Sequence, residues 1–176
     1  MKILDATCGT RTIWMEKHNR DTTYIDIRPE VKPDIVADAT HTPFPDCTFD
    51  IILFDPPYKN FHHKGIYFPK NRSLGRRRGP RYAFIYGKFT TAYILDFVRG
   101  AFAEFYRILK DDGLVFMKWN DTSISLLHAM RLRGNFVPIF GQNFNKIKAH
   151  STTAWICFRK DLDGKQAMLM DGGARS

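Results

Sequence analysis

The stretch "FDIILFDPPYK", residues 49–59, ends a run of strand-forming apolar residues with an acid, two prolines and a tyrosine. Neither Pro56 nor Pro57 has an N–H group to donate to a neighbouring strand, and each fixes its own φ. The pattern therefore predicts a strand that stops at Asp55. Beyond it we expect a rigid turn that presents a carboxylate, backbone carbonyls outside any ladder and the ring of Tyr58.

Three earlier apolar runs also lead into an acid: "KIL" into Asp5, "TYI" into Asp26 and "DIVA" into Asp38. Short apolar runs that alternate with helix-like segments are typical of βαβ units, and they predict an α/β fold with a mostly parallel central sheet. Ligands of open α/β sheets bind beyond the carboxyl ends of the strands. We therefore expect these acids to line one edge of the sheet.

The second half of the chain predicts two helices and three further strands. Apolar residues at helical spacing indicate a long helix over residues 91–109, which "KDDG" ends. Strands are predicted over 113–119, 136–140 and 152–158, a second helix over 123–133 and a flexible tail over 161–176. The residues of the long helix predicted to face the core are Leu95, Val98, Phe102, Phe105 and Leu109.

Length, charge and cysteine content limit the class of protein. A chain of 176 residues that is 44% hydrophobic can bury one core, so we expect one domain, residues 1–160. Its net charge of +9 favours polyanionic partners. The three cysteines have no CxxC spacing, so no metal is expected. A first strand at Ile3 and the lack of an apolar run of about 20 residues predict a cytoplasmic protein with no membrane association.

Residues 59–88 differ from the rest of the chain, because they contain no Asp or Glu and mix basic with aromatic side chains. Cations meet phosphates and aromatic rings stack on bases, so this composition suits a nucleic-acid-binding loop. A solvated, mobile insertion is the alternative. The residues predicted to contact nucleic acid are Lys59, Arg76, Arg77, Arg78, Arg81 and Tyr82, together with Lys118 and Asn120 after the fifth strand.

The segment "LDATCGTRT", residues 4–12, predicts a strand, a tight turn at Gly9 and a helix that starts at Thr10 or Thr12. Such a turn lets a ligand approach the backbone closely, although a structural turn is an equal alternative. Asp26 is placed to accept hydrogen bonds from both ribose hydroxyls of an adenosine, and Asp38 from the amine of its adenine. For each acid, a helix cap or turn role is the alternative.

In this order, the turn, the ribose acid, the adenine acid and "DPPY" resemble the class I S-adenosylmethionine-dependent methyltransferases. More narrowly, they resemble the enzymes that methylate exocyclic amines of adenine or cytosine in nucleic acids. With "FMKWN" and "TTAWICF", the chain also looks like short methyltransferase-like proteins of bacteriophages. The resemblance covers residues 1–160 and implies a single Rossmann-like methyltransferase domain, with a basic insertion after its fourth strand.

The resemblance implies S-adenosylmethionine as the cofactor and a set of site residues. Asp55 and the carbonyl of Pro56 would accept the amine hydrogens and aim the nitrogen lone pair, while Tyr58 would stack on a base taken out of its helix. The implied catalytic residues are Asp55, Pro56, Pro57 and Tyr58. The implied cofactor-binding residues are Asp5, Ala6, Thr7, Cys8, Gly9, Arg11, Asp26, Ile27, Asp38, Ala39 and Asp55.

The expected activity is methyl transfer to adenine N6 in DNA. The alternatives are an RNA base, cytosine instead of adenine, and a non-catalytic nucleic-acid-binding subunit of the same fold. Relatives that act on duplex DNA carry a larger recognition region, so a homodimer or a partner subunit is a further expectation. Arg11 either pairs with the cofactor carboxylate or crowds the turn.

Overall fold

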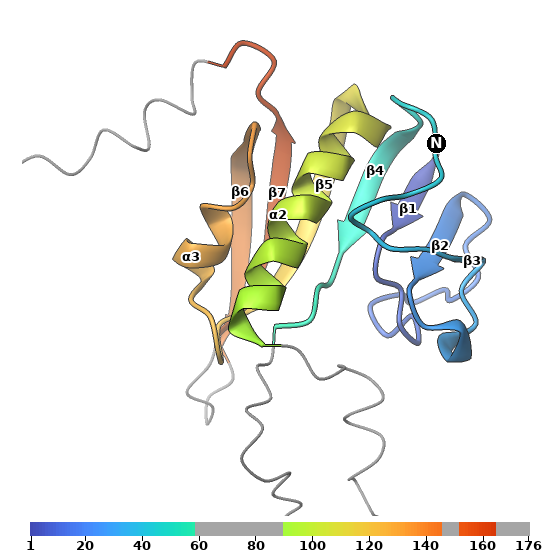
Figure 1. The fold of residues 1–176 in the computed structure, drawn as a ribbon, viewed down its shortest axis with the longest axis horizontal. Coiled ribbons are helices and arrows are strands. Elements are labelled where there is room, and N and C mark those ends of the chain that lie inside the picture. Colours follow the sequence, from blue (N-terminus) through green and yellow to red (C-terminus); the bar gives the residue numbers. More distant parts are fainter. Residues whose placement is uncertain (59–89, 146–151, 165–176) are drawn as a thin grey trace, which may run out of the picture.

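The computed structural model describes residues 1–58, 90–145 and 152–164, which form a seven-stranded sheet in the order β3-β2-β1-β4-β5-β7-β6 (Figure 1). Strands β1 to β5 pair in parallel, whereas β7 is antiparallel to both β5 and β6. The prediction of an α/β fold with a mostly parallel sheet is therefore confirmed. The strands are β1 Ile3–Asp5, β2 Thr22–Asp26, β3 Ile35–Val36, β4 Phe49–Phe54, β5 Leu109–Asn120, β6 Phe136–Asn145 and β7 Thr152–Lys160.

The predicted strand ends hold for three of the four acids. β1 ends at Asp5, β2 ends at Asp26, and β4 ends at Phe54, directly before Asp55. β3 is shorter than predicted, because it ends at Val36 and the chain then turns. Asp38 and His41 form an isolated antiparallel β-bridge in this turn. The basic insertion, residues 59–88, and most of the predicted tail, residues 165–176, lie outside the described residues.

The prediction of a helix after the first strand is wrong. Residues 6–21 form a series of turns, and only the 3-10 helix η1, Pro29–Val31, precedes β3. Gly9 has φ +49° and Arg11 has φ +57°, and these left-handed values interrupt a right-handed helix before its first turn closes. In residues 1–48 the connections between parallel strands are therefore turns and loops, not α-helices.

Helix α2, Thr91–Ile108, confirms the long predicted helix and crosses one face of the sheet (Figure 1). The Thr90 side chain accepts the Tyr93 N–H and starts the helix. Leu109, predicted as its last core-facing residue, instead begins β5, opposite Phe49. Leu95 is only partly buried, because Ile94 takes the inward position beside Val98.

Helix α3, Leu126–Met130, is shorter than the predicted span of 123–133. The Ser125 side chain accepts the His128 N–H, so the helix begins after Ser125. The strands predicted over 113–119, 136–140 and 152–158 all exist, and each is longer than its apolar run because ladder pairing continues into the polar flanks.

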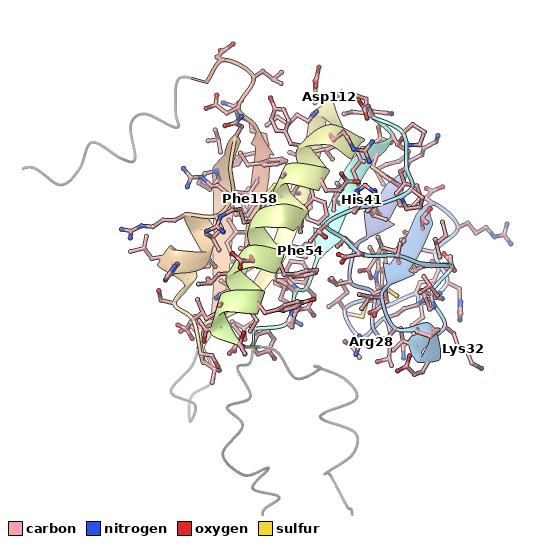
Figure 2. The ribbon with its side chains drawn as sticks, viewed as in Figure 1. Arg28, Lys32, His41, Phe54, Asp112 and Phe158 are labelled. Atoms are coloured by element: carbon pink, nitrogen blue, oxygen red, sulfur yellow. The ribbon has the colours of Figure 1, made fainter. Side chains whose placement is uncertain are left out.

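Aromatic rings form the centre of the core between α2 and the sheet. Phe102 of α2 is 1% exposed and meets Phe54, Phe136 and Phe158, with ring centroids 6.1, 5.5 and 5.4 Å away. Two members of this cluster, Phe54 on β4 and Phe158 on β7, come from different strands of the sheet and are labelled in Figure 2. The cluster joins the parallel and antiparallel parts of the sheet under a single helix.

Phe102→Ala should lower the free energy of unfolding by about 3–5 kcal/mol, because it removes a buried ring and leaves a cavity. Urea denaturation measures this change. Leu127→Ala on α3 is the control, since Leu127 is 65% exposed and its loss should change the free energy by less than about 0.5 kcal/mol. A Phe102→Ala loss below about 1 kcal/mol would contradict this account of the core.

Candidate functional site

A cavity of about 340 Å³ lies at the carboxyl ends of β1, β2, β3 and β4. The first turns of α2 close its far side. Its lining therefore comes from the edge at which the sequence predicted a site. The lining residues are Ala6, Thr7, Cys8, Gly9, Thr10, Thr12, Ile13, Asp26, Ile27, Arg28, Ala37, Asp38, Ala39, Asp55, Pro56, Pro57, Tyr93 and Phe97.

The turn after β1 is tied to both neighbouring strands. The Cys8 N–H donates to the Ile25 carbonyl at 3.0 Å, and the Ala6 N–H donates to the Leu53 carbonyl at 2.9 Å. Gly9 donates its N–H to Asp26 Oδ2 at 2.9 Å and has a φ of +49° that other residues rarely adopt. These bonds thus fix the backbone of the turn where it lines the cavity.

Asp26 is 5% exposed, and its side-chain oxygens accept hydrogen bonds from the turn and from Arg28. Its Oδ1 accepts from Arg28 N and Nε at 3.0 and 2.9 Å, and its Oδ2 accepts from Arg28 Nη2 at 2.8 Å as well as from Gly9. Burial alone would raise the pKa of Asp26, but the hydrogen bonds and charge of Arg28, with the Gly9 N–H, outweigh it and lower that pKa. Asp26 is therefore an ionised acceptor whose partner is a neighbouring guanidinium.

Arg28 was missed by the sequence reasoning. It lines the cavity beside Gly9, and its place after β2 is visible in Figure 2. An arginine two residues after an acid at a strand end was the available signal, because both side chains then reach the same edge of the sheet. A ribose that bonds Asp26 must displace the Arg28 guanidinium from it.

Asp5 is fully buried and does not line the cavity. Its carboxylate accepts the Trp14 indole N–H at 2.7 Å and the Thr7 N–H at 3.3 Å. Burial raises the pKa of Asp5 to about 7, and the nearby Asp55 and Asp26 charges add to this, against the lowering effect of the two hydrogen bonds. The structure gives Asp5 a place beneath the turn, from which it orients Thr7 and Trp14.

Arg11 points away from the cavity. Its guanidinium contacts Asp34 Oδ1 at 3.2 Å and the Lys17 carbonyl at 3.0 Å, and it lies 4.0 Å from the centre of the Tyr24 ring. Neither predicted role, pairing with a cofactor carboxylate or crowding the turn, matches these contacts. Arg11 instead braces the loop between β1 and β2 against η1.

Asp55, Pro56 and Pro57 line the cavity, as predicted for the "DPPY" turn. The Asp55 N–H donates to Thr7 Oγ1 at 3.0 Å, and its Oδ2 accepts from Lys118 Nζ at 2.8 Å. Burial raises the pKa of Asp55, and the charge and hydrogen bond of Lys118 partly oppose this. The fourth member of the turn, Tyr58, is partly buried against the core and is not among the lining residues.

The remaining predicted residues divide between the cavity and other places. Ile27, Asp38 and Ala39 line the cavity, and Asp38 Oδ1 also accepts from the N–H and hydroxyl of Thr40, both at 2.8 Å. Asn120 does not line it and donates to Thr153 Oγ1 at 2.8 Å. The predicted nucleic-acid contacts in the basic segment lie outside the described residues: Lys59, Arg76, Arg77, Arg78, Arg81 and Tyr82.

An aromatic pair at the start of α2 was also missed. Tyr93 and Phe97 both line the cavity, with ring centroids 6.3 Å apart and planes at 6°. Rings at positions i and i+4 in the first turns of a helix that returns to this edge were the signal for them. They supply a flat apolar wall next to Asp38.

Metal and membrane features are absent from the part of the chain that the structure describes. No group of three or more His, Cys, Asp or Glu side chains there could hold a metal ion, and all three cysteines are free thiols. Among the described helices, none is both long and apolar enough to cross a bilayer.

No protein-family model and no curated protein matches the chain. Solved structures do match. The PH0226 protein of Pyrococcus horikoshii has 14% identity and a TM-score of 0.58 over 90% of this chain and 81% of that one. A TehB-like SAM-dependent methyltransferase of Corynebacterium glutamicum has 15% identity and a TM-score of 0.54 over 90% and 79%.

A third structure is the 1,6-didemethyltoxoflavin-N1-methyltransferase of Burkholderia thailandensis, solved with S-adenosylhomocysteine and its substrate bound. It has 14% identity and a TM-score of 0.51 over 90% of this chain and 70% of that one. At such identities the likeness concerns the fold. The chain has the Rossmann-like fold of class I methyltransferases.

Asp5→Asn should change how stability depends on pH. Because the pKa of Asp5 is raised from 3.8 to about 7 on folding, the wild-type protein loses up to about 4 kcal/mol of stability between pH 4 and pH 7, where the carboxyl ionises in the unfolded state but keeps its proton in the folded state. Asparagine keeps a hydrogen-bond acceptor but no charge. The variant should therefore gain stability relative to wild type as the pH rises from 5 to 8, measured by urea denaturation, and an equal difference at both pH values would contradict the raised pKa.

Proposed function

We propose that this protein is an S-adenosylmethionine-dependent methyltransferase that acts on an exocyclic amino group of a nucleic-acid base, with adenine N6 in DNA as the leading target. The observation that carries the proposal is a single cavity lined by the glycine turn, Asp26 and the Asp55–Pro57 turn. The fold shared with solved methyltransferases supports the reaction type.

The residues of the cavity suit an adenosine-containing sulfonium. Gly9 leaves room for close approach to the backbone, Asp26 offers two carboxylate oxygens to a ribose, and Ile13, Ala37 and Phe97 give apolar walls for an adenine ring. When bound, S-adenosylmethionine would supply an electrophilic methyl group and leave as the neutral thioether S-adenosylhomocysteine, while the amine would lose one proton. Asp26 would hold the ribose, for which Arg28 would have to give up its bonds to the Asp26 oxygens, and Asp38 would accept a hydrogen bond from the adenine amine.

Asp55 and the Pro56 carbonyl position the target amine. An exocyclic amine is a weak nucleophile, because its lone pair is delocalised into the ring. Two acceptors that each take one amine hydrogen favour a pyramidal nitrogen with its lone pair aimed at the methyl group, so orientation supplies much of the rate. Thr7 fixes Asp55 from the β1 side through its bond to the Asp55 N–H.

Nucleic acid is proposed as the substrate because the chain carries a net charge of +9 and the basic segment 59–88 follows directly on the "DPPY" turn. RNA keeps the same chemistry and needs no base extrusion from a duplex. A homodimer or partner subunit would extend the recognition surface.

A second candidate function is a non-catalytic nucleic-acid-binding subunit of the same fold. The observation that favours it is the Asp26–Arg28 contact, which fills the oxygens that a ribose requires. The two candidates differ in cofactor affinity, since the non-catalytic subunit would bind neither S-adenosylmethionine nor S-adenosylhomocysteine.

The decisive experiment is transfer of a labelled methyl group from S-adenosylmethionine to duplex DNA, single-stranded DNA and RNA pools, followed by nucleoside analysis. N6-methyladenine in a DNA pool would support the leading proposal. Product in the RNA pool alone would move the substrate to RNA. Transfer to no pool, with no binding of S-adenosylhomocysteine by calorimetry, would favour the non-catalytic subunit.

Asp55→Ala should abolish methyl transfer while the dissociation constant for S-adenosylhomocysteine changes by less than about threefold, because Asp55 serves the amine. Asp26→Ala should instead act on the cofactor, and its binding should weaken by at least about tenfold. Asp112→Ala is the control, as Asp112 is exposed at the opposite end of the sheet (Figure 2). A large loss of cofactor binding in Asp55→Ala would mean that its role is misassigned.

Replacement of Arg76, Arg77 and Arg78 by glutamine should weaken oligonucleotide binding and reduce its salt dependence. The slope of log K against log salt should fall by up to about 3, since each lost phosphate contact on a duplex removes about 0.9. Fluorescence anisotropy over a salt series measures it. The control removes the same charge from three exposed arginines elsewhere, Arg99, Arg131 and Arg159. Equal slopes for the two triple variants would contradict a role for the basic segment.

A further inference from the structure

Lys118 stands beside Asp55 as a consequence of sheet register. β4 and β5 are parallel neighbours with Phe54 opposite Met117, so the next residues, Asp55 and Lys118, emerge side by side. Lys118 Nζ lies 2.8 Å from Asp55 Oδ2, and the side chains are 27% and 19% exposed. This pair is therefore reachable by a ligand at the edge of the sheet.

Asp55 separates two regions of that edge. On its β1 side lie Thr7 and the cavity, and on its β5 side lies Lys118, which is not among the cavity-lining residues. A cofactor in the cavity therefore approaches Asp55 from the β1 side. The β5 side is left for the substrate, and Lys118 lies on that side.

The pair keeps spare hydrogen-bonding capacity while it stays paired. An ammonium has three N–H donors and a carboxylate has about four lone-pair sites. In residues 1–58, 90–145 and 152–164, Lys118 uses one donor, on Asp55 Oδ2, and Asp55 Oδ1 accepts no hydrogen bond. An acceptor and a donor thus stand next to each other, about one hydrogen-bond length apart.

We propose that Asp55 and Lys118 together read an amine and the ring nitrogen beside it, with Lys118 as a specificity-determining residue. This inference rests on the proposed function. Asp55 accepts a hydrogen of the exocyclic amine while Lys118 donates to the lone pair of the adjacent ring nitrogen. Adenine presents this pattern at N6 and N1, and cytosine presents it at N4 and N3.

The same pair rejects bases with the opposite pattern. Uracil, thymine and the Watson–Crick edge of guanine place a carbonyl oxygen beside a ring N–H. A carbonyl against Asp55 and an N–H against Lys118 would leave acceptor facing acceptor and donor facing donor. Lys118 therefore excludes oxo bases from the position that Asp55 serves.

The test uses oligonucleotides that carry one target base or its analogue with the ring nitrogen replaced by C–H. The analogues are 1-deazaadenine for adenine and 3-deazacytosine for cytosine. Affinity is measured by fluorescence anisotropy and kcat/KM by methyl transfer, for wild type, Lys118→Met and Lys118→Arg. Lys110→Met is the matched control, because Lys110 makes an equivalent ion pair with Asp50, at 2.6 Å, between the other ends of β5 and β4.

For wild type and Lys110→Met, the analogue should lower affinity and kcat/KM by at least about tenfold, because a charged donor loses its acceptor. For Lys118→Met, affinity for the normal base should fall by the same factor, and the analogue should cause less than about a twofold further loss. Lys118→Arg keeps a donor and should keep the penalty. A merely structural role for Lys118 would leave the analogue penalty unchanged in Lys118→Met.

Two results would overturn the inference: an analogue penalty that persists in Lys118→Met, or its absence in wild type. Failure of the proposed function is a different result, because wild type would then methylate neither adenine nor cytosine in any pool. Both results above are obtained with a wild-type protein that methylates the normal base.

Discussion

The parallel pairing of β1 with β4 is the constraint on which the candidate site depends. It places the end of β1 beside the end of β4, where the Ala6 N–H bonds the Leu53 carbonyl and the Asp55 N–H bonds Thr7 Oγ1. Two prolines after Asp55 prevent the ladder from continuing, so the chain must leave the sheet at that point. The glycine turn and the "DPPY" turn are therefore held against each other by one main-chain bond and by one bond from a main-chain N–H to the Thr7 hydroxyl.

The acids at this edge are controlled by their neighbours in different ways. Asp26 and Asp55 each have a cation at hydrogen-bond distance, Arg28 for one and Lys118 for the other. The bonds and charge of Arg28, with the Gly9 N–H, outweigh burial and lower the pKa of Asp26, whereas Lys118 only partly opposes burial and the pKa of Asp55 stays raised. Among the described residues no cation lies at hydrogen-bond distance from Asp5, and burial raises its pKa to about 7. The Asp55–Lys118 pair is partly exposed and the Asp26–Arg28 pair lines the cavity, whereas Asp5 is buried beneath the turn after β1.

Sequence patterns predicted the parallel strands and their acids well, because alternation of apolar runs and acids depends on local residue order. They failed for the segment 6–21, where the left-handed residues Gly9 and Arg11 replace a helix by turns. They also gave Arg11 a role at the cavity, although its guanidinium reaches Asp34 and Tyr24 instead. Backbone conformation at Gly9 and Arg11 decided the first outcome, and the periodicity of apolar residues does not report it.

The sequence by itself determined that the chain has an α/β fold, that Asp26 and Asp55 lie at one edge of its sheet, and that two prolines end β4. These features follow from propensities and hydrogen-bonding capacity within a few residues. Only the tertiary structure decided that Asp26 is held by Arg28, that Asp5 is buried, and that Lys118 stands beside Asp55. Lys118 lies far from Asp55 in the chain, and the register between β4 and β5 is what brings their side chains together.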